Sequence, residues 1–125
     1  MKKIQLQINE YSINAVLYDT QAGQAIWDTL PIQARGNLWG DEIYFPIPAK
    51  LKIENGCEVV QEGDLAFWPP GSAFCIFYGL TPMSEPGEIR PASEVEVIGK
   101  ITNDFKVLKH IKNSPSIIIT RIEKV

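Results

Sequence analysis

The stretch "GDLAFWPPGSAFCIFYG", residues 63–79, places two runs of strand-forming residues on either side of a Trp-Pro-Pro-Gly turn. Aromatic and β-branched residues favour strands, whereas proline and glycine favour turns. Successive side chains of a strand point to opposite faces, so Phe74 and Ile76 share one face. Cys75 and Phe77 share the other. Because both faces are apolar, one must fill a protein interior, and the other must be covered or line a groove.

Alternating apolar and polar residues recur along the chain and predict further strands. These segments are residues 2–8, 11–18, 32–39, 42–47, 57–60, 95–101 and 116–123. Turns are predicted at Asn9-Glu10 and Gly40-Asp41. Residues 79–94 form a proline-rich loop with little to bury. About eight antiparallel strands in so short a chain are most economically closed into a barrel, because closure removes exposed edges.

Two segments interrupt the alternation and predict short helices. In residues 19–31, Asp19 or Thr20 is suited to cap a helix, and Pro31 is suited to end it. In residues 102–115, three apolar residues recur at helical spacing before a proline. The chain is therefore expected to be mainly β, with two helices well separated in sequence.

Composition limits the classes of function. A chain of 125 residues with 45% hydrophobic and 22% charged residues suits one domain spanning residues 1–125. A net charge of −3 argues against nucleic acid as a partner. No apolar run suggests a membrane segment, and the alternating start is no secretory signal, so we expect a cytoplasmic protein. Cys57 and Cys75 fit neither a redox pair nor a zinc site, and no cofactor or metal motif is present. The sequence leaves the oligomeric state open.

Four motifs occur in an order and spacing that resemble a known family. They are "NLWGDEIYF" (37–45), "WPPG" (68–71), "FYGLTPMS" (77–84) and "PASEVEVIGKI" (91–101). Together they resemble the small prokaryotic cyclophilin-like proteins, a family of uncharacterised function, over nearly the whole chain. The resemblance implies a closed eight-stranded antiparallel cyclophilin-like β-barrel with a short helix at either end.

The same resemblance weakens a transfer of cyclophilin activity. Cyclophilins isomerise X-Pro bonds with an arginine from a Phe-His-Arg motif, which this sequence lacks. Alignment of the "VIGK" and "GS" motifs places four residues at cyclophilin pocket positions: Val95, Arg90, Ala73 and Cys75. All four differ from the cyclophilin residues. A divergent prolyl isomerase would need Arg35 or Arg90 to replace the usual arginine.

The leading hypothesis is a groove that binds a peptide segment or a small molecule. The candidate ligand-binding residues are Trp39, Glu42, Tyr44, Trp68, Pro69, Phe74, Phe77 and Arg90. Trp68, beside the Pro-Pro-Gly turn, either stacks on a ligand with its N–H in water or covers the barrel end. Glu42 with Tyr44 either holds an amide or ammonium group or is simply solvated at a hairpin. Arg90 is either a cation for a carboxylate ligand or an exposed loop residue.

Two other functions are compatible with the sequence. One is the divergent peptidyl-prolyl isomerase, if the chain is an enzyme. The other, implied by cyclophilin-like barrels in proteins that process small amides and carboxylates, is a subunit of such a complex.

Overall fold

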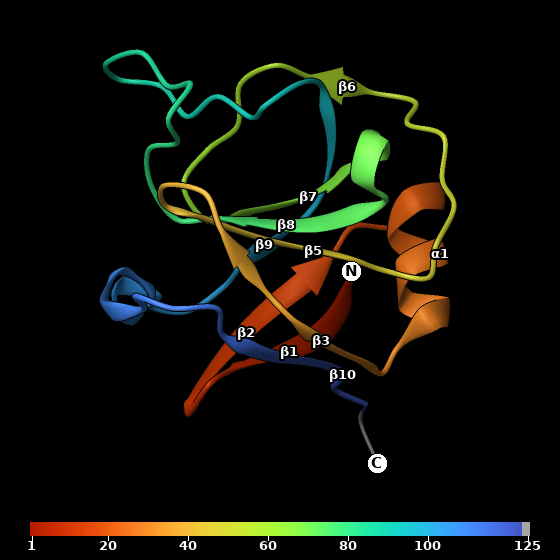
Figure 1. Cartoon of the computed structure of the whole chain (residues 1–125). Helices are drawn as coiled ribbons and strands as arrows, with labels where there is room; N and C mark the ends of the chain where they lie inside the picture. Colours follow the sequence, from red (N-terminus) through yellow and green to blue (C-terminus); the bar gives the residue numbers. More distant parts are fainter. Residues whose placement is uncertain (124–125) are drawn as a thin grey trace.

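The computed structural model describes residues 1–123 and contains a single curved antiparallel sheet (Figure 1). Its strands are β1 (Lys2–Ile8), β2 (Tyr11–Leu17), β3 (Ile32–Arg35), β4 (Asn37–Leu38), β5 (Glu42–Pro46), β6 (Gly56–Cys57), β7 (Asp64–Trp68), β8 (Ala73–Phe77), β9 (Val95–Ile101) and β10 (Ser116–Arg121). The helical elements are α1 (Gln21–Thr29) and the 3₁₀ helices η1 (Pro69–Gly71) and η2 (Lys106–His110).

The sheet is nearly closed into a barrel. Its strand order is β3-β10-β1-β2-β9-β7-β8-β5-β4, with the short β6 paired to β9. The first and last strands of this order, β3 and β4, follow one another in the chain through Gly36, so the sheet must curl until its two ends meet. Eight strands have four or more residues, and β4 and β6 have two each. The predicted antiparallel barrel is confirmed, with a small opening in place of full closure.

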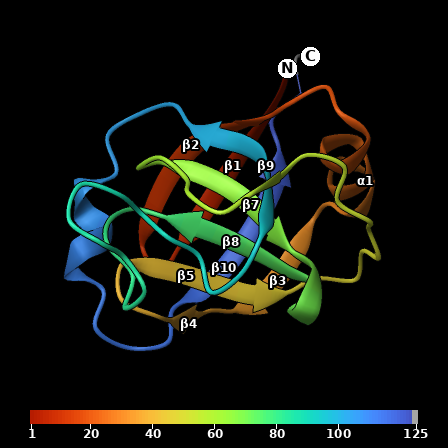
Figure 2. The same cartoon turned by 90° about the horizontal axis from the view of Figure 1, so that it is seen from above.

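The first predicted helix is confirmed, whereas the second differs from the prediction. Thr20 caps α1, because its hydroxyl accepts the Gly23 N–H at 3.0 Å, and Leu30, before the proline, is extended. The second segment forms the 3₁₀ helix η2 on the opposite side of the barrel (Figures 1 and 2). Phe105, Leu108 and Ile111 recur every third residue, which is the repeat of a 3₁₀ helix. No helix in residues 1–123 is long and apolar enough to cross a membrane.

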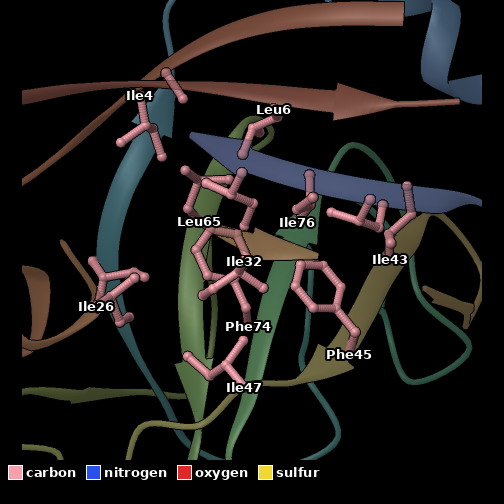
Figure 3. Packing of buried hydrophobic residues seen from close by; sticks show 14 of the residues in the cluster. Ile4, Leu6, Ile26, Ile32, Ile43, Phe45, Ile47, Leu65, Phe74 and Ile76 are labelled. Carbon is pink, nitrogen blue, oxygen red and sulfur yellow. The ribbon is translucent and has the colours of Figure 1, made fainter. Parts of the chain in front are cut away.

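The barrel interior is filled by large apolar side chains that converge from opposite strands (Figure 3). Phe45 of β5 and Phe74 of β8 are fully buried there, and their rings stack with centroids 5.4 Å apart. Ile76 lies on the same face of β8 and is also fully buried. Burial of a side chain of this size contributes about 1.5–3 kcal/mol, so this interior is a major stabilising part of the fold.

A second apolar cluster lies on the outer face of the same strands. Its buried members are Val60, Ala66, Ala73, Cys75, Phe77, Ile89 and Val95. The loop of residues 79–94 covers this face: it lies above β7 and β8 in Figure 1, on the side away from β1, β2 and β10, and in front of the sheet in Figure 2. The prediction that this loop has little to bury is wrong, because Thr81, Ile89 and Pro91 are buried.

Candidate functional site

A cavity of about 240 Å³ lies between the outer face of the sheet and the end of the covering loop. Its lining residues are Trp39, Glu42, Tyr44, Trp68, Pro91, Ala92 and Val95. They come from the β4–β5 turn, β5, the end of β7, the covering loop and the start of β9. The cavity therefore exists only when these five parts of the chain have come together.

The β4–β5 hairpin positions three lining residues. Trp39 and Glu42 close it through two backbone hydrogen bonds, with N···O distances of 2.9 and 3.2 Å. Gly40 has a positive φ of 61° and Asp41 does not, which is the pattern of a type II′ turn. The first central residue of such a turn needs a positive φ, and glycine adopts it without strain. Alternation along β5 then places Glu42 and Tyr44 on the outer face.

Small side chains on the neighbouring strands leave room beside these aromatic residues. Tyr44 pairs with Cys75 of β8, and Cys75 pairs with Ala66 of β7. Trp68 at the end of β7 pairs with Ala73. Large residues at these three small positions would fill the outer face, as Phe74 and Ile76 fill the interior.

The indole of Trp68 is fixed in place at the edge of the cavity. Its Nε1–H donates to the Ser93 hydroxyl at 2.7 Å, so the expectation that this N–H is left to water is wrong. On the turn η1, a Cβ at Gly71 would lie 2.9 Å from Trp68 Cζ3, which shows that the ring lies directly against this glycine. The turn and the covering loop thus hold one aromatic wall from two sides.

The covering loop is ordered by its own hydrogen bonds. The Ser84 hydroxyl accepts the N–H groups of Thr81 and Arg90, both at 3.0 Å, and the Thr81 hydroxyl donates to the Arg90 carbonyl. The Val60 N–H also donates to the Ile89 carbonyl at 2.9 Å, which fastens the loop to the strand side. Pro91 follows directly, so the roof of the cavity is preformed.

Glu42 is the one acidic residue among those that line the cavity, and it is 5% exposed. Burial raises the pKa of its carboxyl from 4.5 to about 7, and contact with the Cys75 thiol opposes this in part. Burial likewise raises the pKa of Cys75, with the Glu42 charge adding to the effect. Burial and the charges of Asp41 and Glu42 raise the pKa of Tyr78 to about 12. The site therefore offers a carboxyl group that changes charge near neutral pH.

The structure brings together half of the predicted ligand-binding residues. Trp39, Glu42, Tyr44 and Trp68 line the cavity. Phe74 does not line the cavity. Its side chain is 0% exposed, because the alternation of side chains along β8 directs it into the barrel. Phe77 lies in the outer cluster, but it is buried beneath the surface and is not among the lining residues. Pro69 begins the turn η1 directly after Trp68 and does not line the cavity.

The two candidate arginines lie outside the cavity. Arg35 is exposed on β3, where its guanidinium donates to the Ser114 carbonyl at 3.1 Å. Arg90 belongs to the covering loop, but its Nε donates to Glu88 at 2.7 Å, and its Nη1 lies 4.0 Å from Glu58. The guanidinium of Arg90 is thus paired with acids of its own surface instead of facing the cavity.

Three lining residues were not among the predicted site residues: Pro91, Ala92 and Val95. Val95 is one of the four positions that align with cyclophilin pocket residues, and that alignment is the signal that could have identified it. Pro91 and Ala92 are small apolar residues of a loop, and their types alone carry no signal. In the described part of the chain, no three histidine, cysteine, aspartate or glutamate residues gather as metal ligands would.

The fold and the site together define a small antiparallel barrel domain with an aromatic cavity on its outer face. The chain belongs to the cyclophilin-like family, whose model matches residues 2–120. No curated protein matches it significantly.

Two solved structures share the fold. The hypothetical protein AF2241 from Archaeoglobus fulgidus, known from a solution structure, is 38% identical, with a TM-score of 0.82 over 97% of this chain and 95% of that one. McbB, whose structure was solved in complex with tryptophan, is 11% identical, with a TM-score of 0.71 over 98% of this chain and 45% of that one. At that identity, the likeness to McbB concerns the fold alone.

Proposed function

We propose that this protein is a binding domain that accepts part of a small molecule or a peptide side chain in the outer cavity. The observation that carries the proposal is the convergence of three aromatic residues and one buried carboxyl, from separate parts of the chain, on one preformed space. Mostly apolar walls with a few placed polar groups are typical of small-ligand sites.

The size of the cavity limits what it holds. Its volume of about 240 Å³ is below the roughly 300–1,000 Å³ of sites that enclose whole drug-sized ligands. One side chain or one head group therefore fits inside, and the rest of the ligand extends over the exposed Ala92 and Ser93 of the loop.

The test is a titration of ¹⁵N-labelled protein with proline-containing peptides and pooled metabolites. The chain has three tryptophans, and Trp27 is an internal control because its ring packs under Arg121, outside the cavity. A ligand of the cavity shifts the indole N–H signals of Trp39 and Trp68 and leaves that of Trp27 in place. Shifts confined to other surfaces, or none at any concentration, would contradict the proposal.

The geometry does not favour the divergent prolyl isomerase. Stabilisation of a twisted amide needs a donor aimed at the reacting group, and both candidate arginines are engaged elsewhere. The same peptide samples address this alternative. Accelerated X-Pro exchange that is lost on Arg35→Ala or Arg90→Ala would establish it.

A further inference from the structure

We propose that the cavity recognises an alkylated ammonium group, with the Glu42 carboxylate as its counter-charge and Trp39, Tyr44 and Trp68 as its aromatic walls. This inference rests on the proposed binding function and names the chemical class of the ligand. It follows from three features of the site: the aromatic walls, the buried acid without a cation, and the scarcity of hydrogen-bond acceptors.

The aromatic faces favour a cation. The π-face of an aromatic ring carries partial negative charge, and tryptophan attracts cations most strongly of the three aromatic side chains. Two tryptophans and a tyrosine line the cavity. Such an attraction contributes most where water is excluded, and Glu42, beside these rings, is only 5% exposed.

The acid of the cavity has no cation of its own. Among residues 1–123, no lysine, arginine or histidine nitrogen lies within 4.0 Å of the Glu42 carboxyl oxygens. The nearby cations are paired with other acids: Arg90 with Glu88 at 2.7 Å, and Lys109 with Asp41 at 4.0 Å. A buried carboxylate is stabilised by an opposite charge, so a cationic ligand supplies what the chain does not. An anionic ligand would meet repulsion instead.

The walls favour alkyl substituents on the ammonium nitrogen. A primary ammonium has three N–H donors, each of which loses a water partner on burial and needs an acceptor. Apart from the Glu42 carboxylate and the Tyr44 hydroxyl, the lining side chains offer no acceptor: those of Pro91, Ala92 and Val95 are apolar, and the Trp68 N–H is a donor already bonded to Ser93. Methyl groups in place of N–H donors reduce the number of acceptors that the ligand needs, and they pack against the apolar walls.

The charge on Glu42 makes recognition depend on pH. The ionisable groups that interact with it are Cys75 from β8 and, through the Glu42 charge, Tyr78 after β8. Asp41, its neighbour in the β4–β5 turn, acts on the same tyrosine, and Tyr44 is its neighbour on the outer face of β5. Because the pKa of Glu42 is about 7 without a ligand, its ionised fraction rises about tenfold between pH 6 and pH 8, and affinity for a permanent cation rises with it.

The experiment compares choline with 3,3-dimethylbutan-1-ol, which has nearly the same shape and no charge. Binding is followed through the indole N–H signals of Trp39 and Trp68, with Trp27 as the control. At pH 8 choline is expected to bind at least about tenfold more tightly than the alcohol, because it gains both the counter-charge and the cation–π attraction. Equal or tighter binding of the alcohol overturns the inference and leaves the proposed binding function intact.

Two variants assign the preference to one residue. Glu42→Gln keeps the side-chain shape and is expected to lower the preference for choline to the part that the aromatic walls supply, and to abolish its pH dependence. Glu58→Gln removes the same charge from an exposed position outside the cavity and is expected to retain both. A preference that is undiminished in Glu42→Gln, or that still depends on pH in the same way, overturns the inference.

If neither probe shifts the two indole signals, the inference is overturned. The proposed function then depends on the peptides and metabolites alone, and it fails as well if none of them moves these signals.

Discussion

Strand β8 packs into the barrel interior with one face and supports the outer cavity with the other. On the inner face, Phe74 and Ile76 are fully buried in a tightly filled barrel, and Phe74 stacks on Phe45. On the outer face, Ala73 and Cys75 are buried as well, but there Tyr44 and Trp68 pack against their cluster and line the cavity. Burial alone therefore does not separate residues that hold the fold together from residues that support a site; the face of the strand does.

The largest expected effect comes from the inner face. Phe74→Ala removes a fully buried ring and its stacking partner contact, which costs about 3–5 kcal/mol of unfolding free energy. Cys75→Ala, one position along the strand, removes one small atom beside an existing cavity and costs about 1 kcal/mol. Urea denaturation measures both. Similar losses for the two variants would contradict the contrast between the faces.

The next effect tests the electrostatics of the outer face. Burial raises the pKa of Glu42 from 4.5 to about 7, so the folded protein holds this proton more tightly than the unfolded chain does. Its contribution to stability therefore falls as pH rises from about 4.5 to about 7, by about 3 kcal/mol at most. Glu42→Gln removes this dependence and is expected to be the more stable protein at pH 8.

Denaturation curves of the wild type and Glu42→Gln at pH 5 and pH 8 provide the measurement. The difference between the two proteins isolates Glu42 from other titrating groups, because those are common to both. A difference in stability that does not change with pH would show that Glu42 is not held in a dry site.

A smaller effect concerns the position of Trp68. Ser93→Ala removes the acceptor of the indole N–H, which costs about 0.5–1.5 kcal/mol of stability. The freed ring is expected to weaken binding of any cavity ligand several-fold, because one wall is no longer preorganised. Ser12→Ala, at an exposed position of β2, also removes one side-chain hydrogen bond; it is the matched control and should leave ligand affinity unchanged. Unchanged affinity for Ser93→Ala would contradict the role given to this hydrogen bond.

The smallest expected effect is that of Arg90→Ala, which tests whether an arginine takes part in ligand binding. Arg90→Ala breaks a surface ion pair with Glu88, and such pairs contribute about 0–1 kcal/mol. Since its guanidinium does not line the cavity, ligand affinity should change less than twofold. A large loss of affinity would place Arg90 in the binding site after all.

Much of the fold could be predicted because alternation, caps and turns are local. The Thr20 cap and the Gly40-Asp41 turn follow from two or three residues each. The second helix was harder, because Phe105, Leu108 and Ile111 at intervals of three fit an α-helix or a 3₁₀ helix equally well.

The site was predicted only in part, because half of it depends on long-range packing. Alternation correctly separated the faces of β8, but with apolar residues on both faces it left open which face Phe74 occupies. Pro91 and Ala92 line the cavity because hydrogen bonds of Thr81 and Ser84 fold the covering loop back over the sheet. The residues that flank Pro91 and Ala92 in the sequence do not indicate that these two line a cavity.

The most direct test of the account is a ¹³C NMR titration of the Glu42 side-chain carboxyl, without and with choline. We expect a pKa of about 7 in the free protein, because the group is buried beside the outer cavity. When choline is bound, we expect a lower pKa, because the cation stabilises the carboxylate. A pKa near 4.5 in the free protein, or one that choline does not move, would contradict the account.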